Sequence, residues 1–204
     1  MKIWMKNIFN ILLFFFSTLL ISQDAGFSNI LDAVYPDKNT LKFFKNYSID
    51  SPKNTIYNIN IVVKSELNSV IKLDYESDSF NKIIFSEVLD VPVEQNTGLD
   101  SRTERFKGNI NPYVIRRAPF RIFEIIKPLS SNTLISKSNF SLINVKIPID
   151  KKIDLDKHRI DFTVYVNNQK FNLRLKINIH NIVVPDLEKS NFFYTNWFNL
   201  SKME

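Results

Sequence analysis

Two pairs of acidic residues are spaced closely enough to serve as general acid and base. Glu76 lies two positions before Asp78, and Glu87 lies three positions before Asp90. Paired carboxylates hydrolyse glycosidic bonds when one protonates the leaving oxygen and the other activates water or attacks the sugar. Acids along a strand edge are more often part of a solvent-exposed face. Nothing in the sequence separates these four residues from surface acids, so we predict no catalytic residue among them.

Metal-binding and nucleophilic chemistry find little support in the sequence. Asp150, Asp154 and Asp156 cluster in IDKKIDLDKH, and oxygen-rich loops can bind Ca²⁺. Lysines alternate with these aspartates and the glycine of a tight calcium loop is missing, so a solvated turn is favoured. His158 and His180 have no neighbouring ligand at metal spacing and are expected on the surface. The sequence contains no cysteine and none of the common nucleophile, phosphate-loop or zinc motifs, so we predict no metal or cofactor site.

Arginine and aromatic residues alternate in the segment 113–129, YVIRRAPFRIFEIIKPL. The planar guanidinium group pairs with carboxylates and stacks on rings, which makes arginine beside aromatics typical of interfaces. This chemistry indicates an intramolecular or domain–domain contact, and we select Arg116, Arg117 and Phe120 as candidate residues of an interdomain interface. Two alternatives stay open, an edge strand with a basic outer face and a site that binds a sugar or an anion directly.

A second aromatic cluster lies in residues 191–200, NFFYTNWFNL. So many rings would form an exposed apolar patch unless another surface covers them. We interpret the segment as a junction with a neighbouring domain, and the alternative is that the rings fold back and complete the core of this domain. The candidate interface residues in this junction are Tyr194, Thr195, Asn196, Trp197 and Phe198.

The elements that must position these residues are predicted to be β-strands. Residues 170–180, KFNLRLKINIH, alternate strictly between apolar and polar types, as a half-buried strand requires. Residues 159–166 alternate in the same way, and Asn167 and Asn168 between the two runs predict a hairpin turn. Further strands are expected at 56–63, 70–75, 82–89, 113–117, 121–126 and 142–149.

Regularly spaced short strands indicate an all-β, antiparallel β-sandwich, either immunoglobulin-like or jelly-roll-like. Prolines cannot donate to a strand ladder, so each proline after position 90 is expected at a strand end, an edge or a bulge. The polar stretch 91–112 is predicted to be a long surface loop, of the kind that usually serves function or an interface.

The N-terminus is predicted to be an export signal. Lys2 and Lys6 precede the apolar run 8–21, IFNILLFFFSTLLI, which is too short to span a bilayer and is followed at once by polar chain. We expect a cleavable signal peptide at residues 1–23, a β-sandwich domain at 24–190 and the aromatic junction at 191–204. The protein is therefore expected to be exported, periplasmic or secreted, and not to bind a membrane after cleavage.

The composition mainly excludes classes of function. The formal net charge of +6 falls to +4 without the signal segment, which leaves 25 Lys and Arg against 21 Asp and Glu. These charges are scattered singly, and an exported protein with no basic block is not expected to bind nucleic acid. About 180 residues with an ordinary apolar content are enough for one domain that is held by its core.

Three segments carry a resemblance to a known family. VPVEQNTG at 91–98, NPYVIRRAPFRIFEIIKPL at 111–129 and FFYTNWFNL at 192–200 are similar to the N-terminal domain of glycoside hydrolase family 123 and its uncharacterised bacterial relatives. The likeness extends from about Tyr35 to the end. In that family a β-sandwich precedes a (β/α)8 barrel, which removes N-acetylgalactosamine by a substrate-assisted retaining mechanism.

The resemblance implies a non-catalytic accessory domain of a secreted glycoside hydrolase. The chain would stop about where the barrel begins, so no catalytic residue of the family has a matching position here. The implied partner is a (β/α)8 catalytic domain, in cis or from a neighbouring product, that docks on the regions of Arg116 and Trp197. The alternatives are a free-standing carbohydrate-binding or cell-surface interaction module, and an exported structural protein without a ligand, which burial of Trp197 within this domain would favour.

Overall fold

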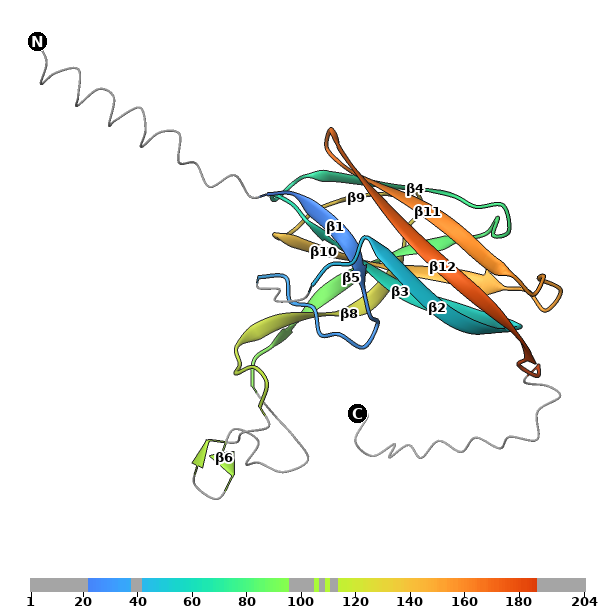
Figure 1. Cartoon of the computed structure of the whole chain (residues 1–204). Helices are drawn as coiled ribbons and strands as arrows, with labels where there is room; N and C mark the ends of the chain where they lie inside the picture. The colour runs from blue at the N-terminus through green and yellow to red at the C-terminus, as the bar shows by residue number, and fades with distance from the viewer. Residues whose placement is uncertain (1–21, 38–41, 96–104, 107–108, 111–113, 187–204) are drawn as a thin grey trace, which may run out of the picture.

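A computed structural model describes residues 22–37, 42–95, 105–106, 109–110 and 114–186, and within them the regular secondary structure consists of strands (Figure 1). Residues 1–21 lie outside this part, so the signal peptide stays a prediction. In the described residues no helix offers a long apolar stretch that could cross a bilayer.

The first sheet has five strands in the order β1-β3-β10-β5-β8, and every neighbouring pair is antiparallel. β3 and β10 form its centre and pair along ten residues each, whereas β1 and β8 are its edges. The bounds in spatial order are β1 Asp24–Ser28, β3 Thr55–Lys64, β10 Phe140–Ile149, β5 Ile84–Val93 and β8 Phe120–Pro128.

The second sheet has the order β2-β12-β11-β4-β9. β2 runs parallel to β12, which departs from the purely antiparallel sandwich that the sequence predicted; the other pairs are antiparallel. The bounds are β2 Asn46–Lys53, β12 Gln169–Val183, β11 Lys157–Val166, β4 Val70–Glu76 and β9 Thr133–Ile135. A separate pair of two-residue strands, β6 Arg105–Phe106 and β7 Asn109–Ile110, projects away from both sheets (Figure 1).

The strand order within the two sheets is that of an immunoglobulin-like sandwich, with β8 and β9 inserted in the chain between β5 and β10. β1, β3, β10 and β5 occupy the positions of strands A, B, E and D, and β12, β11 and β4 occupy those of G, F and C. The chain crosses from one sheet to the other between β1 and β2, so that the first strand pairs with β3 and the second lies parallel to β12. This resolves the choice that the sequence left between immunoglobulin-like and jelly-roll-like arrangements.

Alternating apolar residues build the core between the sheets. Leu173, Leu175 and Ile177 of β12 are buried, as their strict alternation predicted, and Leu173 and Leu175 lie beside the buried Phe162 and Ile160 of β11 in the same sheet. Completely burying one such aliphatic side chain stabilises the fold by about 1.5–3 kcal/mol. The largest fully buried side chains of this interior are Phe27, Phe162, Ile59, Ile61, Ile71, Leu73, Ile143, Ile147, Ile160, Leu173, Leu175 and Ile177.

The outer face of the first sheet is covered by a segment that we call the strap, residues 29–37 and 42–45 between β1 and β2. Val34 is 2% exposed and packs with Val62, Val88 and Leu142, which point away from the main core, and Phe43 adds to this cluster. A strand whose two faces are both covered accepts apolar residues at consecutive positions, and β3 has such a run.

At Gly26 in β1 the strap lies close against the sheet. A Cβ atom at this position would lie 2.6 Å from Cβ of Phe43 and 3.1 Å from the backbone nitrogen of Phe44. Phe27 and Phe44 hold the two segments together by exchanging backbone hydrogen bonds of 2.8 and 3.3 Å. The close contact explains why a residue without a side chain stands in this strand.

Most strand predictions are confirmed, with two corrections. Residues 114–117 lie outside any strand, so the strand predicted at 113–117 is wrong; Arg116 is drawn instead into contacts with the strap. The long loop predicted at 91–112 begins later, because Val91–Val93 complete β5. The described prolines obey the expectation: Pro92 and Pro148 lie where their strands have a neighbour on one side only, and Pro119, Pro128 and Pro185 stand at strand ends.

Candidate interdomain interface

Arg116 is the centre of a cluster that joins the strap to the segment preceding β8. Its guanidinium group donates from Nη1 to Oδ1 of Asp37 at 3.0 Å and from Nη2 to Oδ2 of the same carboxylate. The group also lies over the rings of Tyr35 and Phe120, 4.5 and 5.2 Å from their centroids. The hydrogen bonds to Asp37 raise the pKa of Arg116 above its ordinary value, so the fork stays charged.

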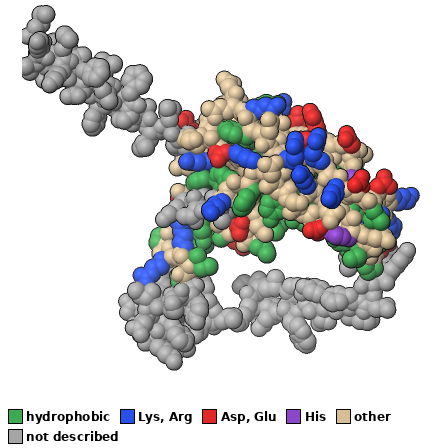
Figure 2. Space-filling model, in the orientation of Figure 1, with side chains coloured by type: hydrophobic (Ala, Val, Ile, Leu, Met, Phe, Trp, Pro, Cys, Tyr) green, Lys and Arg blue, Asp and Glu red, His purple; other side chains and the backbone are tan. Residues whose placement is uncertain are grey.

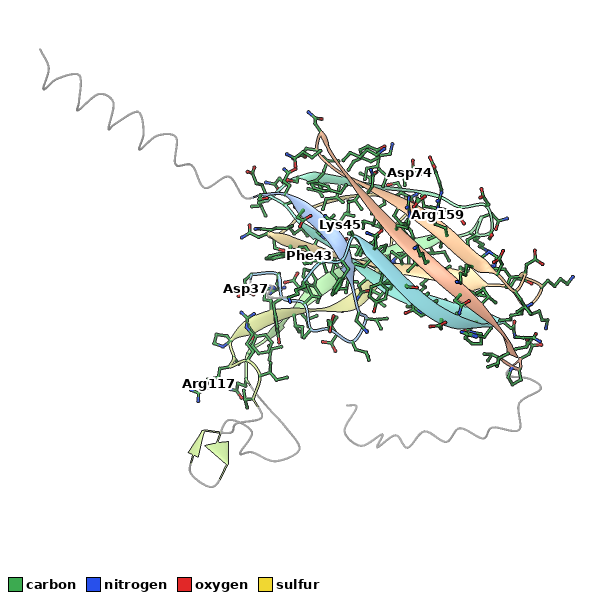
Figure 3. The ribbon with its side chains drawn as sticks, in the orientation of Figure 1. Asp37, Phe43, Lys45, Asp74, Arg117 and Arg159 are labelled. Atoms are coloured by element: carbon green, nitrogen blue, oxygen red, sulfur yellow. The ribbon has the colours of Figure 1, made fainter. Side chains whose placement is uncertain are left out.

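The neighbouring candidates differ in their surroundings. Phe120 is half-buried and meets Tyr35 edge to face, with ring centroids 5.8 Å apart. Arg117 is exposed, at the end of the molecule where β8 begins and where Asp37 also lies (Figure 3). The structure thus brings Arg116 and Phe120 together in an intramolecular contact and leaves Arg117 open to solvent.

Arg121, the third arginine of the motif, pairs with Asp90 across β5 and β8 and donates from Nη2 to the backbone oxygen of Asp90 at 3.2 Å. Sequence reasoning missed Tyr35 and Asp37, the strap partners of Arg116. No local signal could have identified Asp37, which is 79 positions away. The candidates Tyr194, Thr195, Asn196, Trp197 and Phe198 lie outside the described residues.

A polar latch fixes the chain where it leaves the sandwich. Asn54, which takes a left-handed φ of 57° in the β2–β3 turn, donates from Nδ2 to the backbone oxygen of Val184 at 2.7 Å and to Oδ1 of Asp186 at 2.9 Å. Lys151 pairs with the other oxygen of Asp186 at 3.2 Å. The hydrogen bonds from Asn54 and Lys151 hold the pKa of Asp186 below its ordinary value. The β2–β3 turn and the turn that contains Lys151 therefore both bind the chain just after β12.

A groove of about 850 Å³ opens beside this latch. Its lining includes Asn54, Ile56, which is 59% exposed, and the buried side chains of Phe80 and Ile149. The remaining lining residues are Thr55, Ser79, Asn81, Lys82, Pro148, Asp150, Lys152 and Ile153. We call this surface the exit groove.

The two acidic pairs weighed for catalysis lie in different surroundings. Glu87 pairs with Lys137 at 3.0 Å, and Asp90 pairs with Arg121. Glu76 and Asp78 line a second groove of about 750 Å³. None of the described residues form a group of acidic and histidine side chains that could hold a metal ion.

The two histidines form structural contacts at the surface. His158 links two loops, with Nδ1 2.7 Å from Oγ of Ser79 and Nε2 3.0 Å from the backbone oxygen of Asp154. His180 lies 2.8 Å from Oδ1 of Asp50, and Asn178 donates to the same oxygen at 2.7 Å. The hydrogen bonds from Asn178 and His180 lower the pKa of Asp50.

Comparison with known proteins identifies the fold and not a family. No protein-family model matches the chain, and no curated protein matches it. Among solved structures, the chain is similar to a family 123 glycoside hydrolase from Clostridium perfringens, studied for glycolipid glycan hydrolysis, with a TM-score of 0.61 and 15% identity. The match covers 80% of this chain but only 28% of the hydrolase, so the chain spans less than a third of that enzyme.

Two other matches are more distant. The PapD-like domain 7 of human CEP192 matches 79% of this chain over 87% of its own length, with 11% identity and a TM-score of 0.30. The CooA pilin subunit of enterotoxigenic Escherichia coli matches 79% of this chain over 99% of its own, with 10% identity and a TM-score of 0.32. The likeness to the hydrolase establishes a shared sandwich fold.

Proposed function

We propose that this protein is a non-catalytic accessory domain of a secreted glycoside hydrolase related to family 123, whose substrate is an amino sugar. The single observation that carries the proposal is the fold match, which extends over most of this chain and over a limited part of a much longer hydrolase. An accessory domain would match over most of its own length and over only a small part of an enzyme that also contains the catalytic domain.

Four acids of the described residues support the non-catalytic role. Asp90 and Glu87 face basic partners, and Asp186 and Asp50 accept hydrogen bonds from neighbouring amides. A glycosidase needs two carboxyl groups about 5–10 Å apart on either side of a bound sugar. Side chains already engaged in ion pairs and latches serve stability instead.

The proposed partner is a (β/α)8 catalytic domain, in cis or from a neighbouring product, that docks beside the strap and the start of β8. Exposed Arg117 and the apolar Ile115, which is 93% exposed, offer the arginine and aliphatic contacts of an interdomain surface in this region. The Arg116 cluster supports the surface from beneath, because it holds the strap against the segment that leads into β8.

The alternative, a free-standing carbohydrate-binding module, has less support. Sugar-binding sandwiches are expected to present rings to solvent on one face, but among the aromatic side chains that the structure describes only Phe44 is exposed. The outer face of the second sheet carries Lys and Arg instead (Figure 2), with Arg174 and Asp161 paired at 2.7 Å across strands. Calorimetric titration with amino-sugar glycans tests this alternative, and we expect no heat of binding.

The main test is to read the coding sequence beyond the codon for Glu204 and the neighbouring genes. The proposal predicts a (β/α)8 barrel with a pair of catalytic acids in one of these places. The purified chain alone should leave an aryl N-acetylgalactosaminide intact. Hydrolysis by the chain alone, or a neighbourhood without any glycosidase barrel, would refute the proposal.

A further inference from the structure

We propose that one end of the sandwich is a membrane-binding tip, at which exposed aliphatic side chains enter the surface of an anionic bilayer and neighbouring lysines bind its headgroups. The tip consists of the β3–β4, β9–β10 and β11–β12 turns and the strand residues beside them. The sequence predicted no membrane contact after signal cleavage, so this inference departs from that expectation. It does not involve the catalytic partner.

Three aliphatic side chains are exposed together at the tip. Val70, at the start of β4, is 47% exposed and lies directly opposite Ile135 of β9, which is 56% exposed. Their neighbours Ile71 and Leu134 are buried, so Val70 and Ile135 point away from the core. Leu67, in the β3–β4 turn, is 59% exposed. Side chains opposite each other on antiparallel strands are in contact range, so these exposures form one apolar surface.

Hydrogen bonds between the three turns fix the shape of this surface. The buried Ser136 hydroxyl donates to the backbone oxygen of Glu66 at 2.6 Å and accepts from the backbone nitrogen of Ser69 at 2.8 Å. Val70 donates from its backbone nitrogen to Oδ1 of Asn167 at 2.9 Å, and the Asn167 backbone nitrogen donates to the Val70 oxygen at 2.8 Å. The aliphatic side chains are therefore presented by a rigid frame.

Basic residues beside the apolar surface match the charge of an anionic bilayer. Lys72 of β4 and Lys170 of β12 both lie opposite Tyr165 of β11, so an exposed lysine stands on each side of this half-buried ring. Lysines near an anionic bilayer are attracted to its headgroups, and tyrosine is favoured at the boundary between water and lipid. Of the acids near the tip, Asp24 is held in an ion pair and Glu66 is exposed.

An anionic bilayer fits the tip better than a second copy of this chain. In a two-fold dimer built on the tip, the same lysines would face each other and repel. The next acid on this face of β4 is Asp74, one row further from the tip than Lys72. Asp24, at the start of β1, lies opposite Lys64 at the end of β3, so the predicted signal peptide is joined to the sandwich beside the tip (Figure 1).

A fluorescent label tests the contact, because the chain contains no cysteine and an introduced thiol is the only one. L67C carries the dye NBD at the tip, and L155C carries it in the β10–β11 turn at the opposite end, where Leu155 is 52% exposed. The vesicles contain phosphatidylcholine alone or with an equal part of phosphatidylglycerol. We expect the anionic vesicles to raise the emission of L67C severalfold and shift it to the blue, with little change for L155C.

Charge reversal tests the lysines. K72E and K170E are combined in labelled L67C, and the control combines K152E and K157E, which make the same change in net charge at exposed positions of the opposite end. We expect the first pair to raise the vesicle concentration for half-maximal emission by about tenfold or more, and the control pair to change it by less than about twofold. Equal Tm values establish that both proteins are folded.

Several results would overturn the membrane-binding tip. They are an unchanged L67C emission on anionic vesicles, an equal response of both labels, an equal response to phosphatidylcholine alone, and equal binding by the two charge-reversed proteins. An L67C response that needs no vesicles and grows with protein concentration assigns the surface to a second copy and also overturns the proposal. None of these measurements includes a barrel domain, so the accessory role is judged separately.

Discussion

Arg116 shows how much of a site a sequence reveals at the scale of single residues. Its aromatic surroundings, Phe120 above all, were visible in the motif and predicted an interface role. Its carboxylate partner Asp37 could not be predicted from the motif, because Arg116 and Asp37 come into contact only when the strap lies across the outer face of the first sheet. The residue type was informative, whereas the contact depends on the tertiary fold.

Replacing Arg116 with lysine tests the cluster. Lysine keeps the charge but can neither form the two-pronged contact with Asp37 nor stack its head group flat on Tyr35 and Phe120. We expect R116K to lower Tm by a few degrees and to speed hydrogen exchange of the Phe123 amide, which donates to the Val34 backbone oxygen at 3.3 Å. R117K, at an exposed neighbour, should leave both unchanged, and equal behaviour of the two variants would contradict the cluster.

The latch makes a prediction about pH. A carboxyl whose pKa is lowered on folding stabilises the folded state above the ordinary pKa of aspartate, 3.8, and this contribution is lost as the pH falls through the lower folded value. N54G keeps the left-handed turn and removes the amide donor, so the pKa of Asp186 should rise toward 3.8 in an NMR titration. N68G, at another asparagine with positive φ, is the control. If the pKa of Asp186 is the same in N54G as in the original chain, the Asn54 amide does not stabilise the Asp186 carboxylate.

At the scale of elements, the sequence predicted strands where one face is buried and the other is exposed to solvent. β11 and β12 alternate strictly, and Asn167 between them takes a φ of 51°, as the predicted hairpin needs. β2, NYSIDSPK, was missed because only Ile49 and Ser51 are buried and the rest of its sequence is that of a loop. Its parallel pairing with β12 depends on partners distant in sequence, which no local pattern reports.

The packing of the strap on β1 can be tested at Gly26. G26A places a methyl group against Phe43 and the backbone of Phe44, so we expect a loss of about 1–3 kcal/mol in the free energy of unfolding, as overpacking typically costs. Urea denaturation measures it. S28A changes the same face of the same strand but removes a buried hydroxyl with no hydrogen-bond partner, so it should be nearly neutral or stabilising. A neutral G26A would contradict the close approach.

For the whole molecule, an immunoglobulin-like sandwich was within reach of sequence patterns, and the likeness to part of a glycoside hydrolase agrees with it. The proposed docking surface was harder to predict from the sequence. Local residues pointed to the segment of Arg116 and Arg117, but only the fold shows that Arg116 faces inward to the strap and Arg117 outward. The exit groove, built from three connections far apart in the chain, had no sequence signal at all.

The accessory role is tested most directly by sedimentation of the purified chain with a family 123-like catalytic barrel encoded in the same genome. We expect a complex of one sandwich and one barrel that R117E weakens at least tenfold, while R117E leaves Tm unchanged because Arg117 is exposed. If the two proteins sediment independently at concentrations where an interdomain contact should persist, or if R117E binds as tightly as the original chain, the proposed docking surface is wrong.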